Sequence, residues 1–186
     1  MNILNTEFEQ ARLKYKPDKI KYLLVAESPP EIEKKRFFYF EKVKIQDSLF
    51  LQTMKVLYPN HIVDVSTLRS NKSALLKRFQ CDGFYLIDAL DMPIGVKKTK
   101  HKINKISDNL CQLEQKIIKL VHQETKIILI SKPVYEAAYE YLFSKKLNVV
   151  NKEIIPFPGS GWQCDYRIKL MYALGIVQDG EYLVSK

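Results

Sequence analysis

Two carboxylates stand at the ends of predicted strands, where a rigid backbone can hold them over a site. Glu27 directly follows the apolar residues 20–26, and the two prolines of the sequence ESPP stiffen the chain behind it. Such a carboxylate can act as a general base or a metal ligand, or it can be a solvated loop residue. Asp88 lies within residues 84–90, an otherwise apolar stretch in which an unpaired carboxylate is costly. Either backbone donors satisfy Asp88, or it serves a ligand.

An aromatic run with the sequence RFFYF lies in the loop after the first predicted strand. Most aromatic runs pack in a core, but rings beside cations at a strand exit also suit base stacking and phosphate contact. Phe37, Phe38 and Tyr39 are therefore candidates for binding a base, and Arg36 for contacting a phosphate.

A lysine-rich segment covers residues 97–105 and holds no acidic residue. Its basic side chains are Lys97, Lys98, Lys100, Lys102 and Lys105, with His101 among them. A charge run of this kind is either a solvated face or a mobile strip that follows a phosphate backbone.

A late loop carries two prolines and two glycines within residues 156–161 and leads into a predicted helix. The composition indicates a tight turn around Pro158, Gly159 and Ser160, whose backbone amides can hold a phosphate. Trp162, which is the only tryptophan, follows this turn.

Length and charge set the class of protein. The chain has 186 residues and 30 Lys and Arg against 21 Asp and Glu, for a net charge of +9. We expect one domain over residues 1–186, a monomer, with a polyanionic partner. No apolar run approaches the roughly 18 residues that cross a bilayer, and no secretory signal begins the chain, so a cytoplasmic protein without membrane contact is expected. Three scattered cysteines, and histidines without ligand-spaced partners, predict no disulfide, metal or other cofactor.

The elements that position these residues are predicted from apolar periodicity. Four stretches read as strands, at residues 20–26, 84–90, 126–131 and 148–155, and helical patterns lie between them. This alternation predicts a three-layer α/β/α domain with a central four-stranded parallel sheet. Because parallel strands end at one edge of a sheet, the loops described above are expected to lie side by side there.

Taken in order, these pieces resemble the uracil-DNA glycosylase superfamily, over about residues 20 to 175. Its first-strand loop has the form G-[E/Q/I]-x-P-[G/Y], and AESPP at residues 26–30 takes this place, with Glu27 and Pro29 at the matching positions. Its second strand ends in Leu-x-Asn, where this chain has Leu86-Ile87-Asp88, and ISKP at residues 130–133 resembles the exit of the third strand. Phe157-Pro158-Gly159 takes the place of the late His-Pro-Ser loop, which inserts into DNA.

The resemblance implies an enzyme that flips a base out of DNA, stacks it on one of Phe37, Phe38 or Tyr39, and reads it at Asp88. Glu27 would orient the attacking water. Two departures change the expected chemistry. Asp88 replaces an asparagine, and an ionised carboxylate only accepts hydrogen bonds, so it repels uracil O4 and suits an edge with two donors. Phe157 replaces the histidine that stabilises the leaving base, so catalysis would be slow, altered or absent.

Three functions follow from the sequence. The first is a glycosylase-like enzyme that acts on a modified base, and the second is a non-catalytic nucleic-acid-binding module of the same fold. In the third, Glu27, Asp88 and Asp91 hold Mg²⁺ for phosphoryl transfer.

Overall fold

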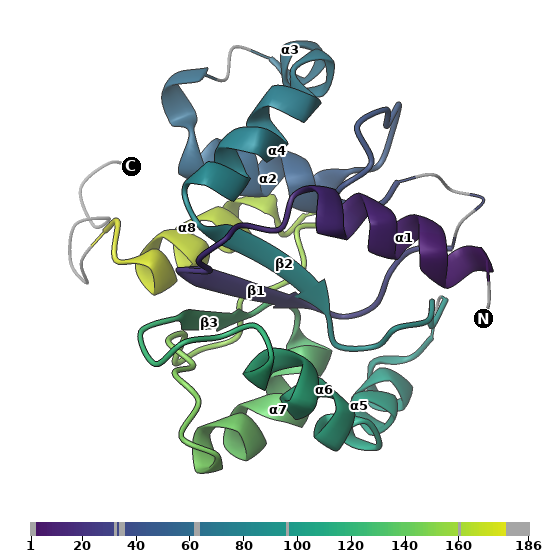
Figure 1. Ribbon diagram of the computed structural model, residues 1–186, viewed down its shortest axis with the longest axis vertical. Helices are drawn as coiled ribbons and strands as arrows, with labels where there is room; N and C mark the ends of the chain where they lie inside the picture. Colours follow the sequence, from purple (N-terminus) through teal and green to yellow (C-terminus); the bar gives the residue numbers. More distant parts are fainter. Residues whose placement is uncertain are drawn as a thin grey trace.

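Three parallel strands form the sheet at the centre of the molecule (Figure 1). The computed structural model describes residues 3–31, 33, 36–61, 64–95, 97–159 and 161–177. The strands are β1 (Tyr22–Ala26), β2 (Phe84–Asp88) and β3 (Lys126–Leu129), in the order β2-β1-β3. Tyr22 pairs with both Phe84 and Lys126, so the three strands start level with one another and end at the same edge.

The apolar composition of the strands matches their burial. Residues 23–26, all of β2, and residues 127–129 are buried. Strands covered on both faces read as continuous hydrophobic runs, which is why three of the four strands could be predicted.

The predicted fourth strand, residues 148–155, forms only two isolated bridges, Ile127 with Val149 and Ile130 with Ile155. Between these two bridges, the side chain of Asn151 forms the hydrogen bonds to the backbone of β3. Its Oδ1 accepts from the Leu129 amide at 2.9 Å, and its Nδ2 donates to the Leu129 carbonyl at 3.2 Å. A side-chain amide thus replaces the backbone at the middle of this ladder, and the sheet has three strands instead of the four that were predicted.

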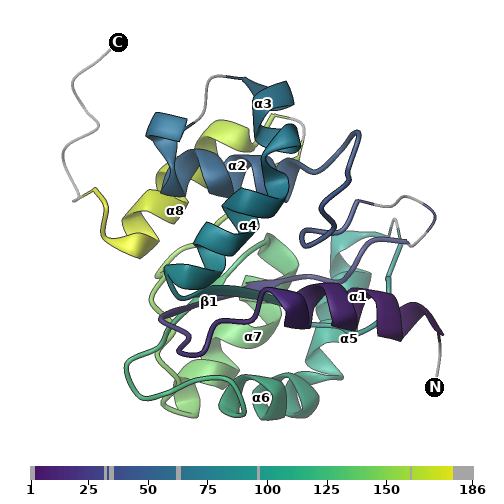
Figure 2. The same ribbon diagram turned by 45° about the horizontal axis from the view of Figure 1, so that its top comes forward.

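Helices cover both faces of the sheet (Figures 1 and 2). One layer consists of α2 (Ser48–Leu57), α3 (Val65–Ser70), α4 (Lys72–Cys81) and α8 (Gln163–Leu174), with the short 3-10 helix η2 (Pro59–His61). The other consists of α5 (Thr99–Ser107), α6 (Leu110–Ile118) and α7 (Lys132–Ser144). The predicted three-layer arrangement is therefore present around a smaller sheet. None of the described helices is long and apolar enough to span a membrane.

The free edge of β2 is covered by α1 (Ile3–Lys14) and by Tyr39. The Tyr39 hydroxyl accepts from the Leu86 amide at 2.7 Å and donates to the Leu86 carbonyl at 3.2 Å. One side chain thereby satisfies two backbone groups that an edge strand would otherwise leave unpaired. Burial raises the pKa of Tyr39 well above its usual value, so the hydroxyl stays neutral and can both donate and accept.

Replacing Tyr39 with phenylalanine should lower the free energy of unfolding by about 1 to 3 kcal/mol, because it leaves two buried backbone groups without a partner. Urea unfolding measures the change. The matched control is Tyr22→Phe, since Tyr22 is half-buried and its hydroxyl makes no hydrogen bond to a described residue. A loss no larger for Tyr39→Phe than for Tyr22→Phe would show that this hydroxyl does not protect the edge.

Candidate functional site

The loops that were predicted to carry chemistry leave the sheet at one edge, which we call the carboxyl edge. The Leu90 amide donates to the Glu27 carbonyl at 3.1 Å, so the chain after β2 runs beside the chain after β1. The Ser131 amide donates to the Ile155 carbonyl at 2.8 Å, which places the late loop next to the end of β3. Register alone thus gathers residues that lie far apart in the sequence.

Glu27 is fixed at the carboxyl edge between two side chains. Its Oε1 lies 2.6 Å from Lys102 Nζ, and its Oε2 accepts from Ser131 Oγ at 3.4 Å. Both Glu27 and Lys102 are half-buried. Glu27 is therefore a positioned carboxylate rather than a solvated loop residue, and Lys102 neutralises it.

Ser131 is the most strained residue of this edge. It has φ 85° and ψ 147°, in a region that favours glycine, and it is buried. A non-glycine residue costs on the order of 1 to 3 kcal/mol in such a conformation, so the surroundings must hold it there. Its Oγ accepts from the Val134 amide at 3.5 Å, which caps α7, and donates to Glu27. The sequence signals the helix cap, but it gives no sign of the strained backbone or of the contact with Glu27.

Asp88 is only 5% exposed and forms an ion pair with Arg12, whose Nη2 lies 2.9 Å from Asp88 Oδ2. Arg12 also binds Glu9 at 3.0 Å. Burial raises the pKa of Asp88, and the charge of Arg12 opposes that rise. A cation from α1 therefore satisfies this carboxylate instead of backbone donors, and sequence analysis did not identify Arg12 as its partner.

Glu27 and Asp88 do not converge on one pocket. Ala26 pairs with Asp88, so the two share a face of the pleated sheet, and Glu27, one residue later, falls on the other face. Their contacts agree with this, since Glu27 meets α5 and the start of α7, whereas Asp88 meets α1.

The aromatic run contributes to the core. Phe37, Phe38 and Tyr39 are all buried, and the Phe38 ring packs against Phe50 and Phe79. Of the three rings that were predicted to stack on a base, Phe37 and Phe38 line neither depression described below, and Tyr39 is only 1% exposed. Arg36 is half-buried and donates to Gln46.

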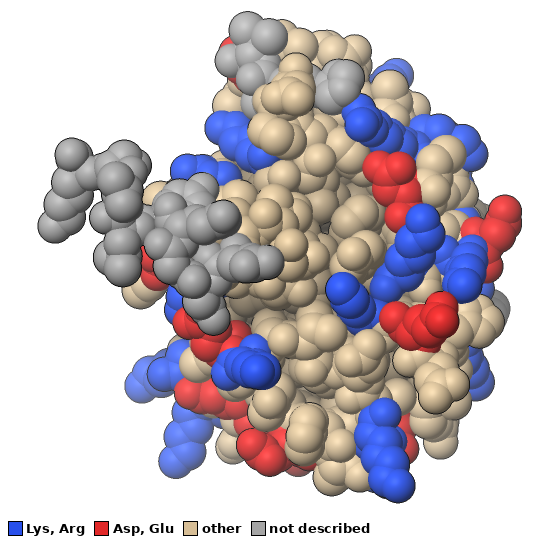
Figure 3. All heavy atoms as spheres, turned by 90° about the vertical axis from the view of Figure 1, so that its left-hand side faces the viewer, with Lys and Arg blue, Asp and Glu red and all other residues tan. Residues whose placement is uncertain are grey.

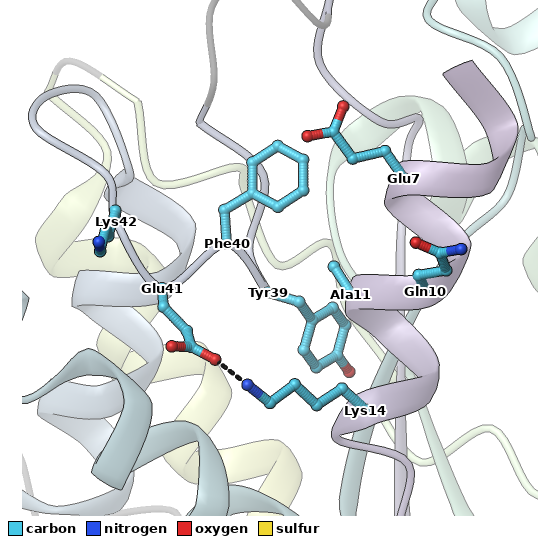
Figure 4. A pocket seen from close by; sticks show the side chains of 8 residues that line it. All are labelled: Glu7, Gln10, Ala11, Lys14, Tyr39, Phe40, Glu41 and Lys42. Carbon is cyan, nitrogen blue, oxygen red and sulfur yellow. Dashed lines mark hydrogen bonds and ion pairs between the residues drawn. The ribbon is translucent and has the colours of Figure 1, made fainter. Parts of the chain in front are cut away.

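A shallow depression of about 490 Å³ lies beside this run (Figure 4). Phe40, which is half-buried, and Tyr39 form its inner wall, and α1 forms another. Glu41 and Lys14 pair across it. It lies on the α1 side, and neither Glu27 nor Asp88 lines it.

The late loop exposes two large rings. Phe157 is 47% exposed and Trp162 is 56% exposed, while Pro158 between them is buried. The Gly159 amide donates to the Phe157 carbonyl at 2.8 Å, and the Trp162 amide donates to the Gly159 carbonyl at 3.1 Å. Those two amides are therefore used within the turn, although the loop was predicted to offer its amides to a phosphate. Ser160 lies outside the described residues.

The lysine-rich segment is part loop and part helix. Residues 99–107 form α5, whose Ile106 is buried, whereas the sequence had been interpreted as a loop up to residue 105. Lys97, Lys98 and Lys100 are exposed and form no ion pair with any residue that the structure describes. Lys102 differs from them, because it is bound to Glu27.

The three carboxylates proposed for Mg²⁺ are each bound to a different cation. Glu27 pairs with Lys102, Asp88 with Arg12, and Asp91 with Lys116 at 2.8 Å. Within the described ranges no three His, Cys, Asp or Glu side chains form a group that could hold a metal ion. These carboxylates thus give the phosphoryl-transfer alternative no ligand cluster.

Charge at the opposite edge of the sheet is mixed. Figure 3 shows the side on which the strands begin, and basic and acidic side chains alternate there around an uncharged centre.

No family model, curated protein or solved structure matches this chain.

The Arg12–Asp88 pair allows a double-mutant test of its role. Arg12→Met or Asp88→Asn alone should each cost about 3 to 5 kcal/mol of unfolding free energy, because each leaves a buried charge without its partner. The double variant should lose much less than the two single losses together. The control is the exposed pair Lys132 and Glu136, 3.5 Å apart, whose coupling should stay below about 1 kcal/mol. Equal coupling in the two pairs, measured by urea unfolding, would contradict a structural role for Asp88.

Proposed function

We propose that this chain binds nucleic acid, DNA in the first instance, at the carboxyl edge of its sheet. The observation that carries the proposal is the pair of exposed rings, Phe157 and Trp162, at the same edge as lysines that form no ion pair with a described residue. Contiguous exposed apolar surface often marks an interaction site. Aromatic rings and cations together are what unstacked bases and their phosphates require.

The two rings suit bases that are out of a duplex. Every base has a flat face, and stacking on an aromatic side chain is worth about 1 to 3 kcal/mol per base. On either side of Ser160, the Gly159 amide donates to the Phe157 carbonyl and the Trp162 amide donates to the Gly159 carbonyl, which holds the backbone that carries both rings. We therefore expect single-stranded or locally opened DNA to bind better than a regular duplex.

The lysines supply the electrostatic part of binding. Lys97 and Lys98 precede α5 and Lys100 lies in its first turn. Each phosphate that a lysine neutralises releases counterions, which makes the affinity depend on salt. With no ion pair to another described residue, these three side chains can turn to a phosphate backbone without breaking a contact.

The proposal includes a divergent uracil-DNA glycosylase-like fold. Its support is the order of motifs at the carboxyl edge. ESPP follows β1, Leu86-Ile87-Asp88 ends β2, ISKP follows β3, and Phe157-Pro158-Gly159 comes last. The parallel sheet with helices on both faces supports this fold for three of its four strands.

Removing both rings tests the stacking role. Phe157→Ala with Trp162→Ala should weaken binding of single-stranded DNA by about 2 to 6 kcal/mol if each ring stacks on one base. Fluorescence anisotropy of a labelled oligonucleotide measures the affinity. Phe143→Ala is the matched control, since Phe143 is an exposed ring at the far end of α7. Equal affinities for the double variant and the control would exclude the late loop from the binding surface.

Base excision is a second candidate, favoured by the fixed position of Glu27. Its carboxylate is half-buried and held by Lys102 and Ser131, as a group that orients a water must be. In hydrolysis that water adds to sugar C1′, the C1′–N bond breaks, and the base leaves with a proton. Asp88 is occupied by Arg12 and Phe157 cannot donate to the leaving base, so binding without excision is the better-supported function.

Glu27→Gln separates the two candidates. If Glu27 is the base, wild-type protein should form abasic sites in oligonucleotides that carry a modified base, and this variant should be slower by a factor of about 10² to 10⁴. Its DNA affinity should not fall, because the glutamine carbonyl still accepts from Lys102 and no positive charge is lost. Glu136→Gln on α7 serves as the control. Binding by wild-type protein without abasic-site formation on any modified base would leave the non-catalytic module.

A further inference from the structure

A second depression lies between α3, the start of α4 and the segment of residues 41–44. It measures about 770 Å³, and we call it the α3 groove. The side chains that matter for its chemistry are Lys42, Lys44, Ser66, Arg69, Ser70 and Ser73. It shares Glu41 and Lys42 with the depression of Figure 4, so the two form one continuous surface.

The α3 groove is positively charged. Lys42 and Lys44 are exposed and form no ion pair within the described part of the chain. Of the described residues that line the groove, Glu41 is the one carboxylate, and it is already engaged by Lys14 and by the Tyr15 hydroxyl at 2.7 Å. Those contacts lower the pKa of Glu41, the bond to Lys14 most of all.

Arg69 is held in the groove by a buried carboxylate. Its Nε and Nη2 donate to Asp47 Oδ1 at 3.1 and 2.8 Å, which fixes the plane of the guanidinium. Nη1 takes no part in this pair. A pre-positioned guanidinium loses little entropy when it binds a further anion.

A second cation, Lys72, lies on the other side of Asp47. Its Nζ is 3.6 Å from Asp47 Oδ2 and 4.3 Å from the centre of the Phe50 ring. Lys72 is 0% exposed, and its Nζ makes no hydrogen bond to a described residue. Burial lowers the pKa of Lys72 to about 8, so most of these side chains are charged at pH 7. One carboxylate thus faces two cations, and positive charge remains uncompensated behind Arg69.

We propose that the α3 groove binds phosphate groups of the DNA backbone and extends the binding surface beyond the carboxyl edge. The inference rests on the proposed function. Lys42, Lys44 and Arg69 supply the charge, and the Ser66 hydroxyl supplies a further donor, whereas the Ser70 hydroxyl already donates to the Thr67 carbonyl. The segment that carries Lys42 and Lys44 lies on the side where the strands end in both ribbon views, so one strand can contact both regions (Figures 1 and 2).

The test compares three double variants that each remove two positive charges. Lys42→Ala with Lys44→Ala changes the groove, and Lys97→Ala with Lys98→Ala changes the carboxyl edge. Lys16→Ala with Lys119→Ala changes two exposed lysines in the segments that lead to the starts of β1 and β3. Affinity for a labelled single-stranded oligonucleotide longer than the carboxyl-edge loops is measured by anisotropy over a range of salt concentrations. Thermal unfolding confirms that each variant folds.

If both groove lysines contact phosphates, the slope of log affinity against log salt should fall by about 1.4 in the groove variant, at roughly 0.7 per contact. The Lys16 and Lys119 control should keep the wild-type slope. A groove variant that matches this control while the Lys97 and Lys98 variant weakens would overturn the groove inference and leave the proposed function standing. If wild-type protein does not bind the oligonucleotide, the groove inference and the proposed function are both wrong.

Calorimetry with pyrophosphate distinguishes a free phosphate ligand from a DNA backbone. Pyrophosphate binding that the groove variant loses, together with unchanged oligonucleotide binding, would assign the groove to a small phosphate ligand and overturn its role in DNA binding. Competition between pyrophosphate and the oligonucleotide, absent in the groove variant, is the result expected here.

Discussion

The parallel register of the three strands is the constraint on which the rest of the site depends. Tyr22 lies level with Phe84 and Lys126, so the strands end together and the chain leaves each of them at the carboxyl edge. The same register places neighbouring side chains at this edge on opposite faces of the sheet. The side chains of adjacent residues alternate between faces, so Glu27 meets α5 and α7 while Asp88 turns to α1. A site that looks continuous in the sequence is thereby divided between the two faces of the sheet.

This division explains why the structure supports the proposed binding role better than base excision. The carboxylates and the aromatic run, which would form an excision pocket, are occupied by ion pairs or buried in the core. The groups left available are exposed on the surface, namely the rings of the late loop and the exposed lysines, and these are the groups that the proposed function assigns to DNA. The proposed contact with DNA would therefore require no rearrangement, whereas the chemistry of base removal would require Asp88 or an aromatic ring to move.

Much of the fold could be predicted from the sequence, because strands buried on both faces are continuously apolar. The fourth strand was the exception, since residues 148–155 have strand-like composition but Asn151 pairs with Leu129 through its side chain. The position of Glu27 after β1 could also be predicted. Its partners could not, because Lys102 and Ser131 are distant in sequence and meet it only through the packing of α5 and α7. Hydrophobicity alone likewise could not tell buried aromatic rings from those that would stack on a base.

Hydrogen exchange with and without single-stranded DNA tests the central claim most directly, because it reports on all loops at once. Binding at the carboxyl edge predicts slower exchange in residues 97–107 and 156–163. Residues 16–21 and 119–125, which lead to the starts of β1 and β3, should exchange at unchanged rates. Protection confined to those two segments, or bound DNA that protects neither loop of the carboxyl edge, would contradict it.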